Sequence, residues 1–526
     1  MLPIILLTIF LCLVLTYVLI ILNRYKYFSL QEIPGPRPQF FFGNFNTLWN
    51  AEFPSRQLQT WTKQFGQIYG IYEGTTPTYV VSNVNFLQEV LIKQFSNFHA
   101  RKVAVRTTNA QLVNLFNSDG ARWKRQRYVI NPTFSALKLK QMSPLINDCI
   151  NQLMTKLPTY ANENEEFNIY ELYKRMTMDV ICRCAFGIDT DMQNDPDNIY
   201  LKKAYKVFAT DTRKRPVAKL SVLIPSLNSL FIKLFLLQNN LKHFINQVFP
   251  SSIKYIEEFP TLWLGNRIHE VIEMRSKGAK QRVDLLQLML EAATRNEIKE
   301  ETSKKNVVDD EGVIAKVLTY NEVKNNVVVF MLAGYETTST ALAYCTYILA
   351  NHSDVQQKLQ DEIDQYIVDD DQQNPDYDIV NRMDYMDMFI KEVLRMHPIA
   401  PRAINRECIK DTIVCGYKIP KGSVIQPDVY SIHYDPDLWG PVDPEKFHPE
   451  RHSTKRHPLC YLPFGSGPRN CVGMRFALTE MKILLTRLLK QYTIVKCDKL
   501  EEKLNIRQIT VIAPEAIWVK LEKRNR

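Results

Sequence analysis

The sequence predicts a mainly α-helical domain with small β-sheets, preceded by one N-terminal transmembrane helix. Residues 2–22 are almost wholly apolar, and about twenty residues at a 1.5 Å rise cross a bilayer core. Long apolar-rich helical patterns occupy residues 321–350 and 474–492, and residues 141–290 are mostly helical. Residues that favour strands gather only in short runs, which accounts for small sheets.

The N-terminal segment is expected to be an uncleaved anchor over residues 1–23, followed by a linker and proline-rich hinge over 24–39 and one domain over 40–526. A cleaved signal peptide is the competing interpretation. The apolar run is too long for one, and it lacks a basic start and an Ala-x-Ala-like exit. Arg24 and Lys26 follow the span and no basic side chain precedes it, so the positive-inside rule places the domain in the cytosol.

Composition restricts the function classes. With 45% apolar and 23% charged residues, the chain of 526 residues is neither disordered nor a multi-span membrane protein. The formal net charge of +10 suits an acidic protein partner or an anionic membrane surface, and no basic tract interleaved with aromatics indicates nucleic-acid binding. The ten cysteines form no C-x-x-C pair and no disulfide-like framework, which disfavours zinc and iron–sulfur sites.

Several shorter elements can be predicted in order. Residues 67–73 and 78–82 should form a hairpin, residues 86–93 a helix, and residues 413–425 a small β element. The apolar stretch 222–237 is either a buried core helix or a surface patch that dips into lipid. Charged stretches at 296–311 and 368–378 should be exposed loops.

The most informative stretch runs from Phe464 to Gly473. Its crowded glycines and proline predict a tight loop that presents Cys471 directly before a helix N-terminus. The helix dipole and its unpaired N–H groups favour a thiolate there, and Arg469 adds a cation. A lone cysteine is usually a small buried hydrophobe, but an anionic sulfur on a rigid loop also suits a heme iron.

The spacing Phe-x-x-Gly-x-Arg-x-Cys-x-Gly is matched by Phe464, Gly467, Arg469, Cys471 and Gly473. It resembles the heme-binding loop of the cytochromes P-450. The resemblance implies the cytochrome P-450 fold, about a dozen helices around a buried heme b. It makes Cys471 the axial iron ligand and Phe464, Arg469 and Gly473 heme contacts.

A second string, Ala333-Gly-Tyr-Glu-Thr-Thr338, lies in the middle of the helix predicted over 321–350. The small pair Ala333-Gly334 would let a flat group approach the backbone, and a threonine hydroxyl can bond back to a carbonyl one turn earlier. Mid-helix threonines are mostly structural. The string is similar to the family signature Ala-Gly-x-[Asp/Glu]-Thr-Thr, which implies that Thr337, with Glu336, delivers protons for dioxygen activation.

Trp123 and Arg127 are four residues apart and share one helix face, where they could grip a carboxylate. A solvated basic face is the common alternative. The pair resembles the family's Trp-x-x-x-Arg helix, which implies that it holds a heme propionate, and the resemblance adds Arg406 as a further propionate partner. The same comparison implies a basic docking surface for the acidic reductase, made of Lys124, Arg125, Lys138 and Lys140.

Glu392 and Arg395 can pair at i and i+3, and Arg451 follows about fifty-five residues later. The family joins these three as a buried structural triad. Its usual Pro-Glu-Arg-Phe string ends here in His452, which affects local packing. His433, His448 and His457 are interpreted as structural. The resemblance also makes 101–119 a substrate-facing loop, and the candidate pocket walls are Phe116, Phe330, Ala333, Ile399 and Ala400.

The resemblance covers nearly the whole chain and is strongest to the animal microsomal family of drug- and steroid-oxidising enzymes, with thromboxane synthase a relative. It implies a monooxygenase in the endoplasmic reticulum membrane that oxidises lipophilic xenobiotics, steroids or fatty-acid-like molecules. NADPH-cytochrome P-450 reductase would supply electrons from NADPH, with cytochrome b5 as a second partner. The alternatives are an isomerase or dehydratase that rearranges a peroxide without reductase, and a non-catalytic heme sensor.

Overall fold

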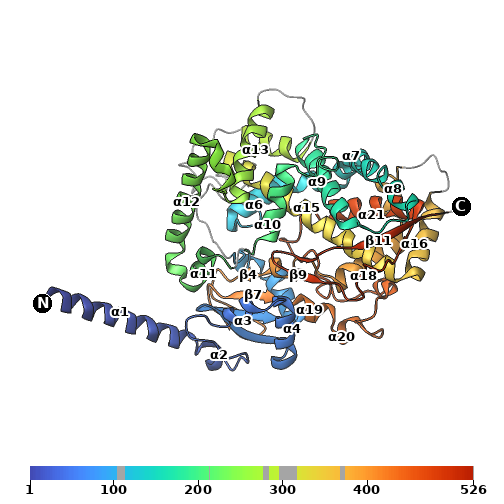
Figure 1. Cartoon of the computed structure of the whole chain (residues 1–526). Helices are drawn as coiled ribbons and strands as arrows, with labels where there is room; N and C mark the ends of the chain where they lie inside the picture. The colour runs from blue at the N-terminus through green and yellow to red at the C-terminus, as the bar shows by residue number, and fades with distance from the viewer. Residues whose placement is uncertain (104–112, 212–213, 277–283, 295–316, 368–373, 525–526) are drawn as a thin grey trace, which may run out of the picture.

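The computed structural model of the chain describes residues 1–103, 113–211, 214–276, 284–294, 317–367 and 374–524. Long helices and small sheets make up these parts, as predicted (Figure 1). The expected loop at 296–311, most of the loop at 368–378 and residues 104–112 of the substrate-facing loop lie outside the described residues.

Helices are distributed along the whole chain. In the first half they are α1 (Leu2–Arg24), α2 (Tyr27–Leu30), α3 (Phe45–Asn50), α4 (Pro54–Phe65), α5 (Val84–Gln88), α6 (Gly120–Ile130), α7 (Ala136–Met154), α8 (Leu157–Asn162), α9 (Ile169–Phe186), α10 (Ile199–Ala209), α11 (Pro216–Leu223) and α12 (Asn228–Val248). In the second half they are α13 (Pro260–Ser276), α14 (Leu285–Thr294), α15 (Tyr320–Asn351), α16 (Ser353–Tyr366), α17 (Tyr377–Val380), α18 (Asp384–Met396), α19 (Val429–His433), α20 (Pro436–Trp439) and α21 (Met474–Gln491).

The predicted hairpin is confirmed. β1 (Ile68–Glu73) pairs antiparallel with β2 (Thr76–Val81), and the register places Ile68 opposite Val81. β7 (Val424–Pro427) joins β2 in parallel and β4 (Arg406–Glu407) closes this sheet. The smaller sheets contain β3 (Phe167–Asn168), β5 (Thr412–Val414), β6 (Tyr417–Ile419), β8 (Tyr492–Val495), β9 (Ile506–Gln508), β10 (Ile512–Pro514) and β11 (Trp518–Lys523).

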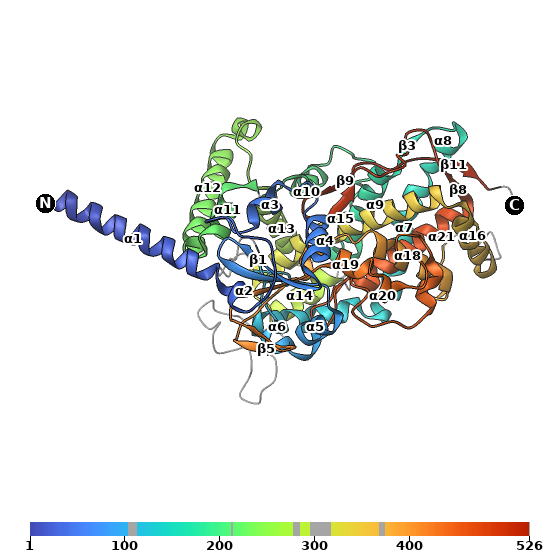
Figure 2. The same cartoon turned by 90° about the horizontal axis from the view of Figure 1, so that it is seen from below.

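Helix α15 runs through the middle of the molecule in both views and packs against α9, α13, α14, α18 and α21 (Figures 1 and 2). A Thr319–Glu322 capping box starts it, which satisfies two N–H groups at a buried helix end. Most of its residues are buried, because an apolar helix surrounded by others has no solvent face. The helix therefore positions the Ala333–Thr338 string at the centre of the core.

Helix α1 projects alone from the domain and is long and apolar enough to cross a membrane, with a mean hydropathy of 3.1 over an 18-residue window within Pro3–Arg24. The tyrosines that follow it contact the domain. Tyr25 donates to the carbonyl of Gly74, and the Tyr27 hydroxyl lies 2.6 Å from that of Tyr79. Phe28 is buried against the same sheet, so this short segment ties the anchor to the domain.

The apolar stretch 222–237 does not form a buried core helix. It divides at Pro225, ending α11 and starting α12, and only Ile232, Asn239 and Asn246 of α12 are buried. Exposed apolar side chains recur along one face of α12, and we call them the α12 stripe: Leu230, Leu234, Leu237, Leu241, Phe244 and Val248. The second alternative, a surface patch, is the arrangement found.

Candidate active site

The loop that carries Cys471 is held by its own backbone. The Cys471 N–H donates to the Phe464 carbonyl at 2.8 Å, and the Asn470 N–H donates to Gly467 at 3.1 Å. Gly467 has a φ of +74°, and a Cβ there would collide with the carbonyl oxygen of Leu91. Only glycine fits both constraints. Helix α21 then begins at Met474 with Gly473 as its N-cap, so Cys471 precedes a helix N-terminus as predicted.

The Cys471 thiol is accessible although protein atoms surround the residue at depth. Burial raises the pKa of this thiol above its ordinary value. The N–H groups of Gly473 and Met474 and the charges of Arg127 and Arg101 lower the pKa, but they offset the effect of burial only in part. The helix N-terminus therefore acts in the predicted direction but does not outweigh burial. A cation bound at the sulfur would be needed to hold the thiolate.

A second accessible surface lies inside the fold on α15. Ala333 is exposed and Thr337, one turn later on the same face, is half-buried, while the residues around them are buried. The Thr337 hydroxyl donates to the Ala333 carbonyl at 2.7 Å, the predicted bond to the preceding turn. An exposed alanine in a central helix indicates that this face borders an internal space.

One aromatic side chain connects this part of α15 with the Cys471 loop. The ring of Phe134 lies 5.9 Å from that of Phe330 on α15 and 6.4 Å from that of Phe476 on α21. A Cβ on Gly473 would meet nothing closer than Phe134 at 4.0 Å. Phe330 lies one turn before Ala333, so the two accessible surfaces belong to the same region of the core.

Gly334 and Glu336 both contact α9. A Cβ on Gly334 would lie 2.9 Å from Ile181, so this glycine permits close packing of α9 rather than the approach of a flat group. The Tyr170 hydroxyl donates to Glu336 Oε1 at 3.1 Å, and Glu336 Oε2 has no hydrogen-bond partner among the residues that the structure describes. Burial raises the pKa of Glu336. The acid and Thr337 are therefore neighbours in sequence that occupy adjacent faces.

Four buried or half-buried arginines converge beside the loop, and among the described residues their hydrogen bonds go to neutral acceptors. Arg127 donates to the carbonyl and the side-chain oxygen of Asn470, at 2.8 and 2.9 Å. Arg406 donates to the carbonyls of its two preceding residues. Arg101 and Arg469 donate to backbone carbonyls, including that of Phe116 in both cases. We call Arg101, Arg127, Arg406 and Arg469 the open arginine cluster.

Charges within the open arginine cluster oppose one another. Burial, together with the charges of Arg101 and Arg469, holds the pKa of Arg406 well below its ordinary value. Burial and the same kind of repulsion lower the pKa of Arg469 to about 8 and that of Arg101 to about 10. Within the described parts of the chain, the Nε atoms of all four arginines and Nη2 of Arg406 have no hydrogen-bond partner. Sequence reasoning missed Arg101 because it lies in a loop without periodicity.

Helix α6 carries Trp123 and several basic residues, and only some of these residues are exposed. Trp123 is buried, with its ring 5.3 Å from the guanidinium of Arg469. Arg125 was expected on an exposed docking surface, but it is buried and makes two hydrogen bonds to Glu322 at 2.6 and 2.9 Å. That expectation is wrong, because Arg125 points into the core toward the start of α15. Lys124 remains exposed.

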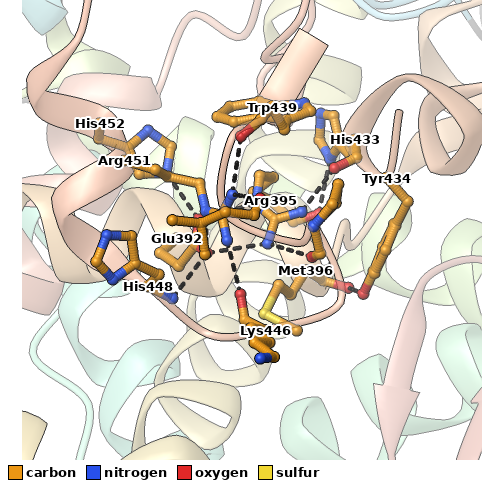
Figure 3. A network of polar contacts seen from close by, with 12 residues as sticks. Glu392, Arg395, Met396, His433, Tyr434, Trp439, Lys446, His448, Arg451 and His452 are labelled. Atoms are coloured by element: carbon orange, nitrogen blue, oxygen red, sulfur yellow. Dashed lines mark hydrogen bonds and ion pairs between the residues drawn. The ribbon is translucent and has the colours of Figure 1, made fainter. Parts of the chain in front are cut away.

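The predicted triad residues meet in a closed network (Figure 3). Arg395 contacts Glu392 through Nε at 2.8 Å and Nη2 at 2.9 Å, and Arg451 Nε lies 2.8 Å from Glu392 Oε1. The remaining guanidinium N–H groups donate to backbone carbonyls, including those of His433 and Trp439. We call Glu392, Arg395 and Arg451 the closed triad.

Two histidines complete this network. His452, which replaces the family's phenylalanine, places Nε2 3.0 Å from Glu392 Oε2. Burial raises the pKa of Glu392, but hydrogen bonds from His452 and Arg395 and the charges of both arginines outweigh it and bring the pKa to about 2. Burial lowers the pKa of His433 to about 3. Its Nδ1 donates to the Arg395 carbonyl and its Nε2 accepts from Leu462, two residues before Phe464.

The remaining candidate wall residues lie in different surroundings. Phe116 is exposed, and its ring lies 4.5 Å from the guanidinium of Arg101. Ile399 is buried and Ala400 half-buried, and the Ile399 carbonyl accepts from Ile512. Phe464 is half-buried in its loop.

Together these residues could hold a planar group with a metal centre and acidic substituents. Among the described residues no cluster of three or more His, Cys, Asp or Glu side chains could hold a metal ion alone, so a metal at Cys471 needs ligands from a bound group. The open arginine cluster offers unpaired donors for carboxylates. Heme b has one iron and two propionates, and the residues fit it.

Comparison with known proteins gives one family. The chain matches the sequence profile described as Cytochrome P450 over residues 33–520. It is similar to cytochrome P450 CYP13A5 of Caenorhabditis elegans, at 33% identity over 95% of each chain. It is also similar to cytochrome P450 3A2 of Rattus norvegicus, at 34% identity over 94% of this chain and 91% of that protein. Cytochrome P450 3A29 of Sus scrofa is 34% identical over 93% and 90%.

Proposed function

We propose that this chain, which belongs to the cytochrome P450 family and is an oxidoreductase of the monooxygenase class, oxidises lipophilic small molecules with electrons from a separate reductase. The observation that carries the proposal is the accessible Cys471 thiol beside an open arginine cluster. Neither feature alone would indicate a binding site, because a buried thiol is inert and unpaired arginines only destabilise a fold.

Bound heme supplies the oxidising chemistry, and the chain supplies its binding site. We assign Cys471 as the residue that would hold the heme iron, and Arg101, Arg127, Arg406 and Arg469 as the donors that would bind the propionates. Trp123, Phe464 and Gly473 would contact the group, and Ala333 would leave room for it because its side chain is small. Arg101 is an addition to the residues expected from the sequence.

Proton delivery is assigned to two residues on adjacent faces of α15. Thr337 has its hydroxyl at the internal space, held by the Ala333 carbonyl. Glu336 holds its proton more readily than an ordinary carboxyl, because burial raises its pKa and no described residue is bonded to Oε2. A water molecule between the two would let the acid resupply the alcohol.

Substrate contacts are assigned to Phe116, Phe330, Ile399 and Ala400, which have apolar side chains. An apolar pocket with few polar groups takes lipophilic ligands. Lys124 and Lys138 remain candidates for docking an acidic reductase, NADPH-cytochrome P450 reductase, and cytochrome b5 would use the same face. Lys140 is already 2.6 Å from Asp378 and contributes less.

We place the protein in the endoplasmic reticulum membrane with its domain in the cytosol. The support is α1, the basic residues that follow it, and the α12 stripe at the same end of the molecule (Figures 1 and 2). The boundaries 1–23, 24–39 and 40–526 are kept for anchor, hinge and catalytic domain.

The test is reconstitution of the full chain with heme, purified reductase and a panel of lipophilic compounds. A monooxygenase couples NADPH consumption to an oxygenated product. A peroxide isomerase or dehydratase turns over without reductase, and a sensor shows neither. Product formation that needs no reductase would contradict the proposal.

The ligand assignment is tested separately by Cys471→Ser. This variant should lose the red-shifted carbon monoxide band of thiolate-ligated heme, whatever the substrate is. Cys460→Ser, which changes a buried cysteine eleven residues earlier, is the matched control and should keep the band.

A further inference from the structure

A small polar cavity lies on the flank of α12, away from the active-site region. Its volume is about 180 Å³, and it is enclosed by α10, α12 and the segment before α13. Thr210, Arg215, Gln238, Asn239, Lys242 and Phe259 are among its lining residues. None of the roles proposed above uses this cavity.

Positive charge exceeds negative charge around the cavity. Glu257 is already paired with Lys203 and Lys206, at 2.9 Å in each case. Glu258 lies 3.1 Å from His243. Within the described part of the chain, Arg215 and Lys242 make no ion pair with a carboxylate. The lining residues include three cations and two carboxylates, which leaves a net charge of +1, and Lys203 adds a further positive charge beside Glu257.

The two unpaired cations are held in place by other contacts. The Arg215 guanidinium lies 4.7 Å from the ring of Phe259. Lys242 donates to the Glu257 carbonyl at 3.3 Å. Asn239 is buried, and its side-chain oxygen accepts from the Phe259 N–H at 2.8 Å. An ordered cation with no acidic partner is a donor for an anionic ligand.

The cavity borders the α12 stripe. Gln238, at the edge of the cavity, lies one helical turn from Leu234 and Leu241, which are more than half exposed. Helix α12 also runs crosswise at the end of the molecule from which α1 projects, in both views (Figures 1 and 2). A helix in that position would lie flat on a membrane that α1 spans, with its apolar face in the lipid and the cavity at head-group level.

We propose that this cavity binds the phosphate of an anionic phospholipid head group, with Arg215 and Lys242 as the donors and the α12 stripe against the acyl chains. The proposal rests on the membrane association proposed above. A lipid is favoured over a soluble phosphate compound because the apolar stripe adjoins the charged cavity. Anionic lipid would thereby fix how the domain sits on the membrane.

The test uses the full heme-loaded chain in nanodiscs of phosphatidylcholine with about one-fifth phosphatidic acid. After transfer to a mild detergent, native mass spectrometry counts the lipids of each kind that stay bound. The wild type should retain phosphatidic acid in preference to phosphatidylcholine. Arg215→Gln with Lys242→Gln should reduce that preference about tenfold, because two charge-assisted donors are lost.

The matched control is Lys233→Gln with Lys254→Gln. Both lysines are exposed on the same surface, outside the cavity, and their loss changes the net charge equally. This control should keep the preference, as should the charge-conserving variant Arg215→Lys with Lys242→Arg. The carbon monoxide band of each variant shows that the heme-loaded fold is intact.

Three outcomes would overturn the proposal: no preference in the wild type, an equal loss in the control, or equally tight binding of glycerol phosphate or inorganic phosphate. The count also separates this proposal from membrane association itself. If the domain does not meet the membrane, neither lipid is retained. If only the cavity assignment is wrong, lipid is retained without preference for phosphatidic acid.

Discussion

The closed triad and the open arginine cluster are built from the same residue type but differ in what they lack. In the triad, Glu392 lies within 2.8 Å of both Arg395 and Arg451, and backbone carbonyls accept from the remaining N–H groups (Figure 3). In the cluster, the guanidinium groups repel one another, and several N–H groups have no acceptor in the described part of the chain. One region is complete without a ligand and the other requires an anion.

This difference shows how to separate a structural arginine from a binding one. Burial alone does not, because Arg395 and Arg406 are both fully buried. The presence of a carboxylate distinguishes the two kinds of arginine. A buried charge needs a partner, and the fold itself supplies a carboxylate only to an arginine with a structural role. Removing one charged side chain should therefore have opposite consequences for the stability of the fold in the two regions.

The largest effect is expected for Glu392→Gln. The change leaves Arg395 and Arg451 buried without a counter-charge, which typically costs about 3–5 kcal/mol in the free energy of unfolding. Urea unfolding of the heme-loaded chain measures it. Glu450→Gln is the control: its carboxylate is 2.6 Å from Lys358 on the surface, and its loss should cost less than about 1 kcal/mol. Equal effects of the two changes would remove the distinction between closed and open clusters.

Acid should weaken the closed triad in a defined range. The pKa of Glu392 is about 2 in the fold, against an ordinary value of 4.5. The folded pKa is depressed, so the stabilisation is complete above about pH 4.5 and is lost as the pH falls toward 2. It amounts to about 3 kcal/mol.

Urea unfolding at intervals between pH 6 and pH 3 checks this prediction. Arg451→Lys keeps the charge but not the geometry of Arg451, so the folded pKa of Glu392 should lie closer to its ordinary value of 4.5. Its loss of stability should begin in the same pH range as in the wild type, but it should be smaller and should end at a higher pH. A wild-type stability that stays level below pH 4.5 would contradict the assignment.

The open arginine cluster should respond to heme rather than to folding. Arg406→Met removes one of the mutually repelling cations, so the heme-free chain should change by less than about 1 kcal/mol or gain stability. The heme-loaded chain loses a charge-assisted donor of about 2 kcal/mol, and heme should dissociate about 30-fold faster. Heme transfer to excess apomyoglobin measures the rate.

Arg125→Met provides the comparison, because Arg125 is buried with its own carboxylate, Glu322. It should destabilise the chain with or without heme. If Arg406→Met instead destabilised the heme-free chain as much as Arg125→Met does, the open cluster would be structural.

Arg125 and its neighbour Arg127 show how much of the site the sequence could predict. The motifs located the Cys471 loop, the α15 string, the triad and the hairpin, because each is encoded by local spacing or turn residues. Arg125 and Arg127 lie two residues apart on one helix, and nothing in the sequence shows which of them meets a carboxylate. That depends on where the start of α15 packs, and the same applies to Gly334, which faces Ile181 on α9.

Contacts between distant segments account for the other differences. Arg101 joins the cluster from a loop without periodicity, and Asn470 holds Arg127 through a carbonyl and an amide that any loop can offer. The apolar stretch 222–237 could be either a buried core helix or a surface patch by its sequence. In the structure it breaks at Pro225, and α10 and α13 pack on each other while the α12 stripe stays exposed. Hydrophobicity alone does not decide between the two.

The smallest effect is expected for His452→Phe, which restores the family's usual residue beside the closed triad. His452 is bonded to Glu392 Oε2 at 3.0 Å, but Arg395 Nε contacts the same oxygen, so the carboxylate keeps a partner. The change should therefore cost less than about 1 kcal/mol at neutral pH. Burial lowers the pKa of His452, so the wild type loses stability as the pH falls below the ordinary histidine value of 6.5, where the unfolded chain protonates first. The phenylalanine variant should have a flatter stability profile between pH 6.5 and pH 5, measured by urea unfolding. A steeper profile in the phenylalanine variant than in the wild type would mean that protonation of His452 strengthens the triad. The triad would then be short of one positive charge at neutral pH, and it would not be complete without a further partner.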